Sequence, residues 1–488
     1  MKVKDINPYY CEVFTFLGAQ AGNGGLWKDA LAQALDSQKI DFSDSSALLQ
    51  ALHRLQRLNK IFIAGLEGNR EFYDFVEQNH PPLWKDFGAP PAEKSLQHAL
   101  AAKLYNARPG RGNVVLMSLG ADSKIIGPWL AEKLIADKIP FIVQFADPVF
   151  DALCLSHADE QGVRNLAGSF VNMAAPVNRR IVAASGLPLK DPVRPDPVKE
   201  KIYQTGIKPY SDRIRSGDIF YTLTVVPTRK DAEVDGIAYE DYTRLFFEMC
   251  DQPWAHIKAV QAMLIAELDA GKKLRMTNSD GTDVSMSIDG FTFCNSVIAK
   301  NVPGSEVFSA PARDSVQGKV VAKGRFIHDR EVIENLTMEF ESGHLVRWHA
   351  DKGQEAFEHA INLDEGARWV GEIGIGTNPH LKRHVANGLL VEKIGGSFHL
   401  ALGAAYSYTE YDDVPVRVNN GNSSALHWDI TTMLHGKQGR IYLDDKLIMD
   451  DGRWLAPEYD VLNRGWESVP ENERPPYWRD YYRQKKRA

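Results

Sequence analysis

The sequence predicts two domains of different fold class. The first is an α/β N-terminal domain with a partly parallel sheet, and the second is a largely antiparallel β domain of the α+β type. Three observations support this. A chain of 488 residues is too long for one ordinary core. A strand, helix, strand pattern covers residues 113–147, and beyond Lys272 hydrophobic residues recur at every second position.

Residues 1–105 are predicted to form a helical N-terminal extension. Leu48, Leu52 and Leu55 follow one face of a helix, and two serines just before them are candidate caps. No catalytic pattern occurs in this stretch. We interpret it as an accessory or interface layer.

The α/β domain is predicted over residues 106–270. Two continuous apolar runs, NVVLMSLG from Asn113 and PFIVQFAD up to Asp147, are typical of buried strands, and the segment between them has helical spacing. This βαβ pattern predicts a parallel sheet. A proline-rich stretch at 186–197 predicts a loop, and a helix expected over 254–270 marks the predicted domain boundary.

The β domain is predicted over residues 271–450. Hydrophobic and polar residues alternate over 284–288 and again over 336–340. This period of two is typical of an antiparallel sheet with one solvent-facing side. The remaining residues, 451–488, form a basic and aromatic C-terminal tail. Its role is open between covering the entrance of a site and extending a dimer interface.

Composition argues against several classes of partner. The net charge of −7 provides no broad attraction for nucleic acid or for an anionic membrane. The start MKVKDINPYYCEVF lacks the apolar core of a secretory signal, and no later run reaches the roughly 20 apolar residues of a membrane span. We therefore expect a cytoplasmic protein. The cysteines show no CxxC spacing and are expected to be reduced thiols: Cys11, Cys154, Cys250 and Cys294.

Residue types that bind metals gather late in the chain, next to small residues that let the backbone approach closely. GEIGIGTNP starts at Gly371, HLALGAAY at His399 and HWD at His427, while NVPGSEVFSAP at 301–311 offers Glu306. Taken alone, each glutamate would most often be a surface carboxylate, and each histidine or tyrosine a hydrogen-bonded core residue. Their joint occurrence predicts a metal site.

Spacing and charge refine this prediction. His427 and Asp429 are two residues apart, so on a strand both side chains point to one face, while Trp428 points to the core. The carboxylates of Glu306, Glu372 and Asp429 together would bring a charge of −3, which favours divalent cations. Imidazole ligands suit zinc or cobalt, and carboxylates also admit manganese.

Taken in chain order, the four segments that begin at Asn301, Gly371, His399 and His427 resemble a known family. It comprises the metalloaminopeptidases typified by aminopeptidase T, aminopeptidase S and PepS, also described as thermophilic metalloprotease-like or leucyl aminopeptidase-like. The resemblance spans roughly residues 105–450. It implies a homodimeric peptidase with two divalent ions, zinc, cobalt or manganese, that hydrolyses N-terminal residues from peptides through a metal-activated water. It implies six metal ligands: Glu306, Glu372, His399, Tyr406, His427 and Asp429.

Three of these residues are also expected to act in catalysis. Glu372 is the candidate to bridge the two ions, and either Glu372 or Glu306 could carry the proton of the attacking water. Tyr406 is expected either to ligate a metal or to donate a hydrogen bond to the tetrahedral oxyanion.

Two other functions remain open. Related 2,5-dihydroxypyridine dioxygenases keep a single iron on two histidines and one aspartate, which here correspond to His399, His427 and Asp429. A non-catalytic metal-binding relative would keep the site for its structural role. Retention of Glu306 and Glu372 favours two ions over one.

The chain also departs from the family pattern. In VEKIGGSFH, Val391 replaces the usual acidic residue and Ser397 the usual threonine, so we expect local repacking. His380 and His384 have the spacing of two metal ligands on a helix, but the glutamate of a zincin motif is missing. We interpret both as surface histidines.

Overall fold

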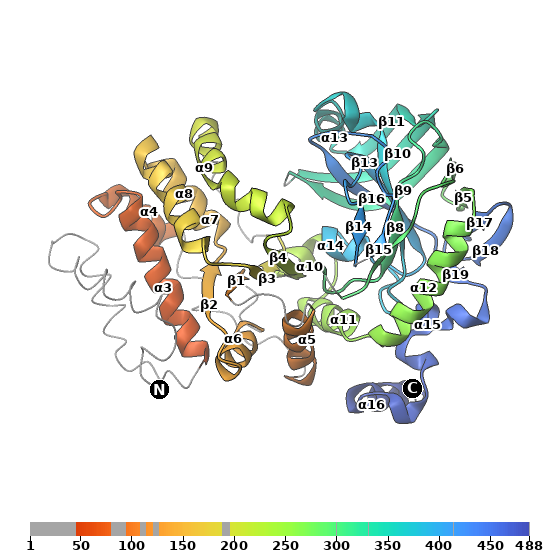
Figure 1. Ribbon diagram of the computed structural model, residues 1–488, viewed down its shortest axis with the longest axis horizontal. Coiled ribbons are helices and arrows are strands. Elements are labelled where there is room, and N and C mark those ends of the chain that lie inside the picture. The colour runs from red at the N-terminus through yellow and green to blue at the C-terminus, as the bar shows by residue number, and fades with distance from the viewer. Residues whose placement is uncertain are drawn as a thin grey trace. The chain divides into compact units, whose positions relative to one another are not determined.

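The computed structural model divides into two compact units, Met1–Lys230 and Asp231–Ala488 (Figure 1). The structure describes residues 45–79, 94–107, 114–120, 126–187, 196–298, 300–329, 331–412 and 414–487. The helix at which the sequence placed a boundary, α12 (Trp254–Ala270), lies within the second unit. The domain limits predicted at residues 105, 270 and 450 stay predictions.

Helices form the described part of the predicted extension. They are α3 (Ser45–Ile63), α4 (Arg70–Asn79) and α5 (Lys94–Asn106). Leu52, one of the three leucines of the predicted apolar face, is buried in α3. Residues 1–44 lie outside the described residues.

The first unit contains a parallel sheet of four strands in the order β2-β1-β3-β4. The strands are β1 (Val115–Leu119), β2 (Phe141–Phe145), β3 (Arg179–Ser185) and β4 (Phe220–Val226). All neighbouring pairs are parallel, which confirms the predicted α/β class. Every residue of β1 is buried because this strand lies inside the sheet, and helix α6 (Gly127–Ala136) connects it to β2.

Aspartates set the starts of the next helices. The Asp147 carboxylate accepts a hydrogen bond of 3.0 Å from the backbone N–H of Phe150 at the start of α7 (Pro148–His157). Asp159 caps α8 (Glu160–Ala174) and Asp196 caps α9 (Pro197–Arg215) in the same way. The loop predicted over 186–197 falls mostly on residues outside the described ranges.

The second unit is built on two antiparallel sheets. One has eight strands in the order β11-β10-β9-β6-β5-β17-β18-β19, and the other five in the order β16-β13-β12-β8-β7. The first comprises β5 (Lys273–Thr277), β6 (Asp283–Ser287), β9 (Gln317–His328), β10 (Glu331–Glu341), β11 (His344–Lys352), β17 (Arg440–Leu443), β18 (Lys446–Asp450) and β19 (Arg453–Trp454). The second comprises β7 (Cys294–Ser296), β8 (Glu306–Ser309), β12 (Val370–Gly376), β13 (Ser397–Gly403) and β16 (His427–Met433). This architecture confirms the predicted antiparallel domain.

Smaller elements complete this unit. A separate two-stranded ribbon pairs β14 (Glu410–Tyr411) with β15 (Val414–Pro415). The helices are α10 (Arg229–Asp235), which begins at the junction of the units, α11 (Tyr239–Cys250), α12, α13 (Gln354–Ile361), α14 (Gly388–Val391), α15 (Asp460–Arg464) and α16 (Pro476–Lys485). Among the helices of the described chain, none is both long enough and apolar enough to cross a membrane.

A single hydrophobic core joins the two sheets. The alternating residues predicted over 284–288 and 336–340 bury their apolar side chains in it. From the five-stranded sheet, Ile373, Leu400 and Trp428 face the same core. Since strand side chains alternate, their neighbours Glu372, His399, His427 and Asp429 point to the opposite face.

The C-terminal tail contributes aromatic side chains to the packing of this unit. Trp478 of α16 is fully buried, and its indole N–H donates a 3.0 Å hydrogen bond to the Asp251 carboxylate. The indole N–H of Trp466 donates a 2.7 Å hydrogen bond to the backbone carbonyl of Asp251. The tail therefore stabilises the end of α11. Buried free thiols are found at Cys154, Cys250 and Cys294, as predicted, and Cys11 lies outside the described residues.

Candidate metal centre

Five of the six candidate ligands come from four neighbouring strands of the five-stranded sheet. Glu372 of β12 pairs with Ala401 of β13, which in turn pairs with Asp429 of β16. Two residues along β13, His399 pairs with Gly374. Because residues two apart share a face, these side chains project from the same side of the sheet.

The outer two ligands extend the same face. His427 pairs with Gly403 at the first residue of β16, and Glu306 pairs with Gly376 at the first residue of β8. One face of the sheet thus carries five of the six side chains that were predicted as ligands. A glycine or alanine lies opposite each of these ligands on one neighbouring strand, whereas the second partner is Thr431 for His399 and Ser296 for Glu306.

Glycines in GEIGIG are required by close approaches. A Cβ atom on Gly374 would lie 2.1 Å from His399 Nε2, so the imidazole lies directly over this residue. A Cβ on Gly376 would lie 2.2 Å from the carbonyl oxygen of Ile394. The small residues that drew attention in the sequence therefore make room for an imidazole and for a neighbouring backbone.

Two carboxylates lie between the two imidazoles. The Nε2 atom of His399 is 3.6 Å from Glu372 Oε1 and 3.8 Å from Asp429 Oδ1. The Nε2 atom of His427 is 3.3 Å from Glu372 Oε2 and 3.6 Å from Asp429 Oδ2. Glu372 and Asp429 each direct one oxygen to each imidazole. Glu306 joins the His399 side, with its Oε2 3.8 Å from Nε2.

These atoms fit divalent cations. An ion bonded at about 2.1 Å to two ligands at a tetrahedral angle would separate them by about 3.4 Å. The buried atoms Glu306 Oε2, Glu372 Oε2 and Asp429 Oδ1 have no hydrogen-bond partner within the described chain. Buried carboxylate oxygens without partners are costly, and a cation would satisfy them. Ligand atoms of Glu372, His427 and Asp429 all lie within 4.8 Å of one another.

The electrostatics of the cluster favour positive charge. Burial alone would lower the pKa values of the imidazoles, but the neighbouring carboxylates raise that of His399 to about 9 and that of His427 to about 10. Burial would raise the pKa of Glu372, yet both imidazoles lower it to about 2. Burial and the charge of Glu372 raise the pKa of Asp429. The carboxylates therefore make the space around the two imidazoles favourable for a cation.

Tyr406 follows β13 and lies beside His427. The centroids of the two rings are 5.1 Å apart, and Tyr406 stacks on Tyr408 at 4.9 Å with an interplanar angle of 17°. The ring of Phe308 packs edge to face on the ring of Tyr406, with the centroids 5.3 Å apart. Burial, followed by the charges of Glu372 and Asp429, holds the pKa of the Tyr406 phenol well above its usual range.

One buried ion pair was missed by the sequence reasoning. The Lys393 ammonium is fully buried and lies 2.5 Å from Glu306 Oε1 and 2.8 Å from Glu392 Oε2. Glu306 therefore places one oxygen on an ammonium and the other near His399. The signal was present in the sequence, because an adjacent acid and base interrupt an apolar stretch at 388–402.

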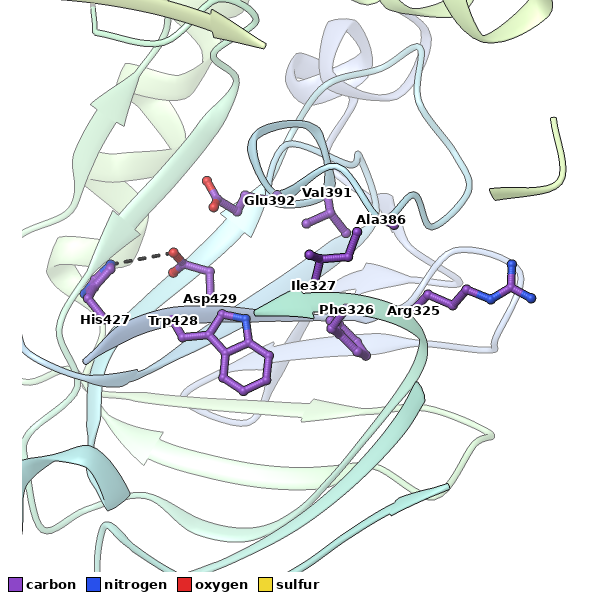
Figure 2. Close-up of a pocket in the computed structure, with 10 residues that line it drawn as sticks. Arg325, Phe326, Ile327, Ala386, Val391, Glu392, His427, Trp428 and Asp429 are labelled. Atoms are coloured by element: carbon purple, nitrogen blue, oxygen red, sulfur yellow. Dashed lines mark ion pairs between the residues drawn. The ribbon is translucent and has the colours of Figure 1, made fainter. Parts of the chain in front are cut away.

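A cavity of about 200 Å³ opens onto this cluster (Figure 2). Its lining includes four apolar residues. Ile327 and Val391 lie on the side of Glu392 and Asp429, whereas Phe326 and Trp428 turn their rings into the hydrophobic core. Its polar lining includes Glu392, His427 and Asp429, which lie together toward one side, while Arg325 points away at the other.

The histidines at 380 and 384 differ from the sequence expectation. His380 and His384 do not lie on a helix, and neither is freely exposed. His380 Nε2 donates a 2.7 Å hydrogen bond to Glu248, and the His384 ring packs edge to face on Phe326 at 5.0 Å. The prediction of surface histidines is therefore wrong, because burial of these rings depends on contacts distant in sequence. Ser397 is buried, and its hydroxyl donates to the carbonyl of Ile394 at 2.8 Å.

Comparison with known proteins agrees with the resemblance read from the four segments. The family model described as thermophilic metalloprotease (M29) matches residues 138–454, more than half of the chain. The chain belongs to this family. A metalloprotease family implies a divalent metal, and all six candidate ligands lie in the matched range.

Individual relatives align over shorter stretches. Aminopeptidase T of Thermus thermophilus is 31% identical over 176 residues, 34% of this chain and 42% of that protein. Aminopeptidase AmpS of Bacillus subtilis is 33% identical over 112 residues, 22% of this chain and 27% of that protein. The alignments thus span less than half of these relatives. The solved structure of wild-type AmpT from Thermus thermophilus matches with a TM-score of 0.58 at 23% identity, covering 74% of this chain and 100% of that one. This structural match supports the fold.

Proposed function

We propose that this M29 protein is a metal-dependent aminopeptidase that removes N-terminal residues from peptides at a two-metal site. One observation carries the proposal: Glu372 and Asp429 each direct one oxygen to His399 and the other to His427. Two carboxylates shared between two imidazoles suit two ions better than one. The aminopeptidase names of the aligned relatives support the substrate class.

The ligands divide into two groups around the shared carboxylates. His399 and Glu306 would hold one cation, and His427 and Tyr406 the other. A divalent cation bound here polarises a carbonyl group and lowers the pKa of a water molecule. The Lys393 ammonium fixes Glu306 from behind and offsets part of the negative charge of the cluster.

The chain's own groups would position the substrate and its charge. The apolar side chains of Ile327 and Val391 would accept the N-terminal side chain, so uncharged residues are the expected substrates. As an alternative to binding a cation, Tyr406 beside His427 would donate a hydrogen bond from its phenol to the oxygen that gains charge in the transition state. The Nδ1 atom of His427 donates a 2.8 Å hydrogen bond to the carbonyl oxygen of Ala404, which directs its Nε2 toward Glu372 and Asp429.

Metal content and substrate selectivity together test the proposal. The protein is stripped with a chelator, reloaded with zinc, cobalt or manganese, and assayed on leucine p-nitroanilide and its N-acetylated form. We expect about two ions per chain, cleavage of the free-amine substrate alone, and loss of activity on chelation. Metal identity, homodimer formation and cytoplasmic location stay predictions.

Two results would contradict the proposal. A single bound iron with oxygen uptake on dihydroxypyridines would favour the dioxygenase alternative. Bound divalent metal without cleavage of any aminoacyl or peptide substrate would favour a non-catalytic relative.

A further inference from the structure

Glu392 lies in the cavity of the metal centre but is not part of the ligand sheet. It follows the last residue of α14, ahead of β13, and lines the cavity with His427 and Asp429. Figure 2 shows its carboxylate on the same side of the cavity as those two side chains. The side chain is 20% exposed, whereas Lys393 is 0% exposed. Glu392 thus meets the space that a substrate would enter.

The other carboxylates of the centre are already engaged. Glu372 and Asp429 each spread their two oxygens over both imidazoles. Glu306 has one oxygen on Lys393 and one near His399. Groups engaged in this way are poor proton carriers, because protonation would remove a cation ligand.

Glu392 is held differently. Its Oε2 accepts a 2.8 Å hydrogen bond from the Lys393 ammonium, and no other hydrogen bond to this carboxylate is found within the described residues. One oxygen is therefore fixed, and the group still reaches the cavity. The same ammonium contacts Glu306 at 2.5 Å, which ties Glu392 to the ligand cluster through a single buried side chain.

We propose that Glu392 is the general base that accepts the proton of the attacking water. The proposal rests on the proposed aminopeptidase function. It replaces Glu306 and Glu372 as the candidates for this role, since both of these face the imidazoles.

The proton and electron balance of the step is simple. As a lone pair of the water oxygen forms the bond to the scissile carbonyl carbon, one water proton moves to Glu392, and the carbonyl π pair moves to the carbonyl oxygen. When the C–N bond breaks, its electron pair goes to the nitrogen, which takes the proton from Glu392. The carboxylate is regenerated, and one water is consumed for each peptide bond.

The charges facing Glu392 suit a base that works near neutral pH. Burial, together with Asp429 and Glu306, raises its pKa to about 8, while Lys393 and His399 act in the opposite direction. Bound cations would add positive charge and bring the pKa lower. A general base with a pKa close to the working pH is the most effective.

The test compares Glu392→Gln and Glu392→Asp with wild type and with Glu355→Gln, a matched change at an exposed position on α13. Metal stoichiometry and affinity are measured by calorimetry on chelator-stripped protein. The inhibition constant of leucine hydroxamate, which needs no turnover, reports binding to the loaded site. Rates on leucine p-nitroanilide are measured across pH.

We expect Glu392→Gln to keep the metal content, the hydroxamate affinity and KM, while kcat falls by about 10²- to 10⁴-fold. The acidic limb of its kcat/KM profile should disappear, and Glu392→Asp should restore part of the rate. Glu355→Gln should match wild type.

Three results would overturn the inference. A raised KM with unchanged kcat would make Glu392 a substrate-binding group. Lost metal would make it part of the metal site, and full activity would make it dispensable. Each of these leaves an active wild-type peptidase and so leaves the proposed function standing. A loaded wild-type protein without peptidase activity would instead overturn the function and this inference together.

Discussion

Glu372 is the side chain on which both halves of the metal centre depend. It is 3% exposed, and its two oxygens lie 3.6 Å from His399 Nε2 and 3.3 Å from His427 Nε2. Burial opposes its charge, and the two imidazoles keep its pKa near 2. A neutral isostere would keep the shape but remove the charge that both imidazole groups face.

Glu372→Gln is therefore expected to abolish turnover and to weaken metal binding at both positions while the chain stays folded. Removal of a ligand charge shared by two cations should lower affinity by at least the 10- to 100-fold seen for lost outer-shell partners. Calorimetric titration measures the metal affinity, and circular dichroism checks that the chain stays folded. Glu365→Gln, an exposed glutamate, is the control. Full activity in Glu372→Gln, or in His427→Ala, would refute the site assignment.

Gly374 offers a steric test of the same centre. A methyl group at this position would lie 2.1 Å from His399 Nε2, so Gly374→Ala should push the imidazole off the sheet and reduce metal affinity and activity together. Gly168→Ala in α8 is the matched control, because no atom lies within 4 Å of its new methyl group. It should stabilise by about 0.5–1 kcal/mol. Normal metal affinity in Gly374→Ala would contradict the placement of the His399 ring over this glycine.

The histidines predict how the metal-free protein responds to pH. Folding raises their pKa to about 9 for His399 and about 10 for His427, above an unfolded value of about 6.5. The resulting stabilisation is complete below pH about 6.5 and is lost as the pH rises through about 9 and 10. We expect the Tm of chelator-treated protein to fall between pH 7 and 10.5. Metal-loaded protein should lack this contribution because its imidazoles are neutral ligands, and equal losses in both forms would contradict the assignment.

At the scale of secondary structure, local periodicity was sufficient for the elements but not for their pairing. The alternation over 284–288 identified a strand because every second side chain is buried in one core. Likewise, the HWD spacing predicted that His427 and Asp429 share a face. Nothing in these local patterns states that Glu306 pairs with Gly376, which lies 70 positions away, because register is decided by contacts between distant strands.

The same limit explains what was missed at the site. The adjacent acid and base in the apolar stretch at 388–402 indicate buried charge, but nothing local indicates that Lys393 pairs with Glu306, which is 87 positions away. The sequence likewise does not reveal that His380 is paired, because its partner Glu248 lies far away in the chain on α11. Such polar pairs can be predicted only once the strands and helices that carry them are placed.

Helix α16 provides a prediction at this scale. Trp478 is fully buried and donates to Asp251, so Trp478→Ala should destabilise the second unit by about 3–5 kcal/mol. Trp478→Phe keeps most of the packing but leaves the Asp251 carboxylate without this donor, and should cost about 1–3 kcal/mol. Urea denaturation followed by fluorescence measures both. Unchanged stability of Trp478→Ala would mean that the tail is not part of the folded core.

At the scale of the whole chain, each unit has its own hydrophobic core. The large cluster that joins both antiparallel sheets lies within residues 254–462, and the clusters around the parallel sheet lie within residues 61–219. All six candidate ligands and the cavity belong to the second unit, Asp231–Ala488. Metal should therefore bind to, and stabilise, that unit alone.

Differential scanning calorimetry of the full chain tests this separation. We expect two transitions, and added metal should raise the midpoint temperature of only one of them. At a free metal concentration of 1,000 times the dissociation constant, the stabilisation of that unit should reach about 4 kcal/mol. Trp478→Phe identifies that transition, because the substitution lies in the second unit and should lower the same peak. Glu372→Gln should remove the metal-dependent rise while leaving the other transition in place. A single transition that shifts as a whole with metal would show instead that the two units unfold together, and that the metal centre stabilises the parallel-sheet unit as well as its own.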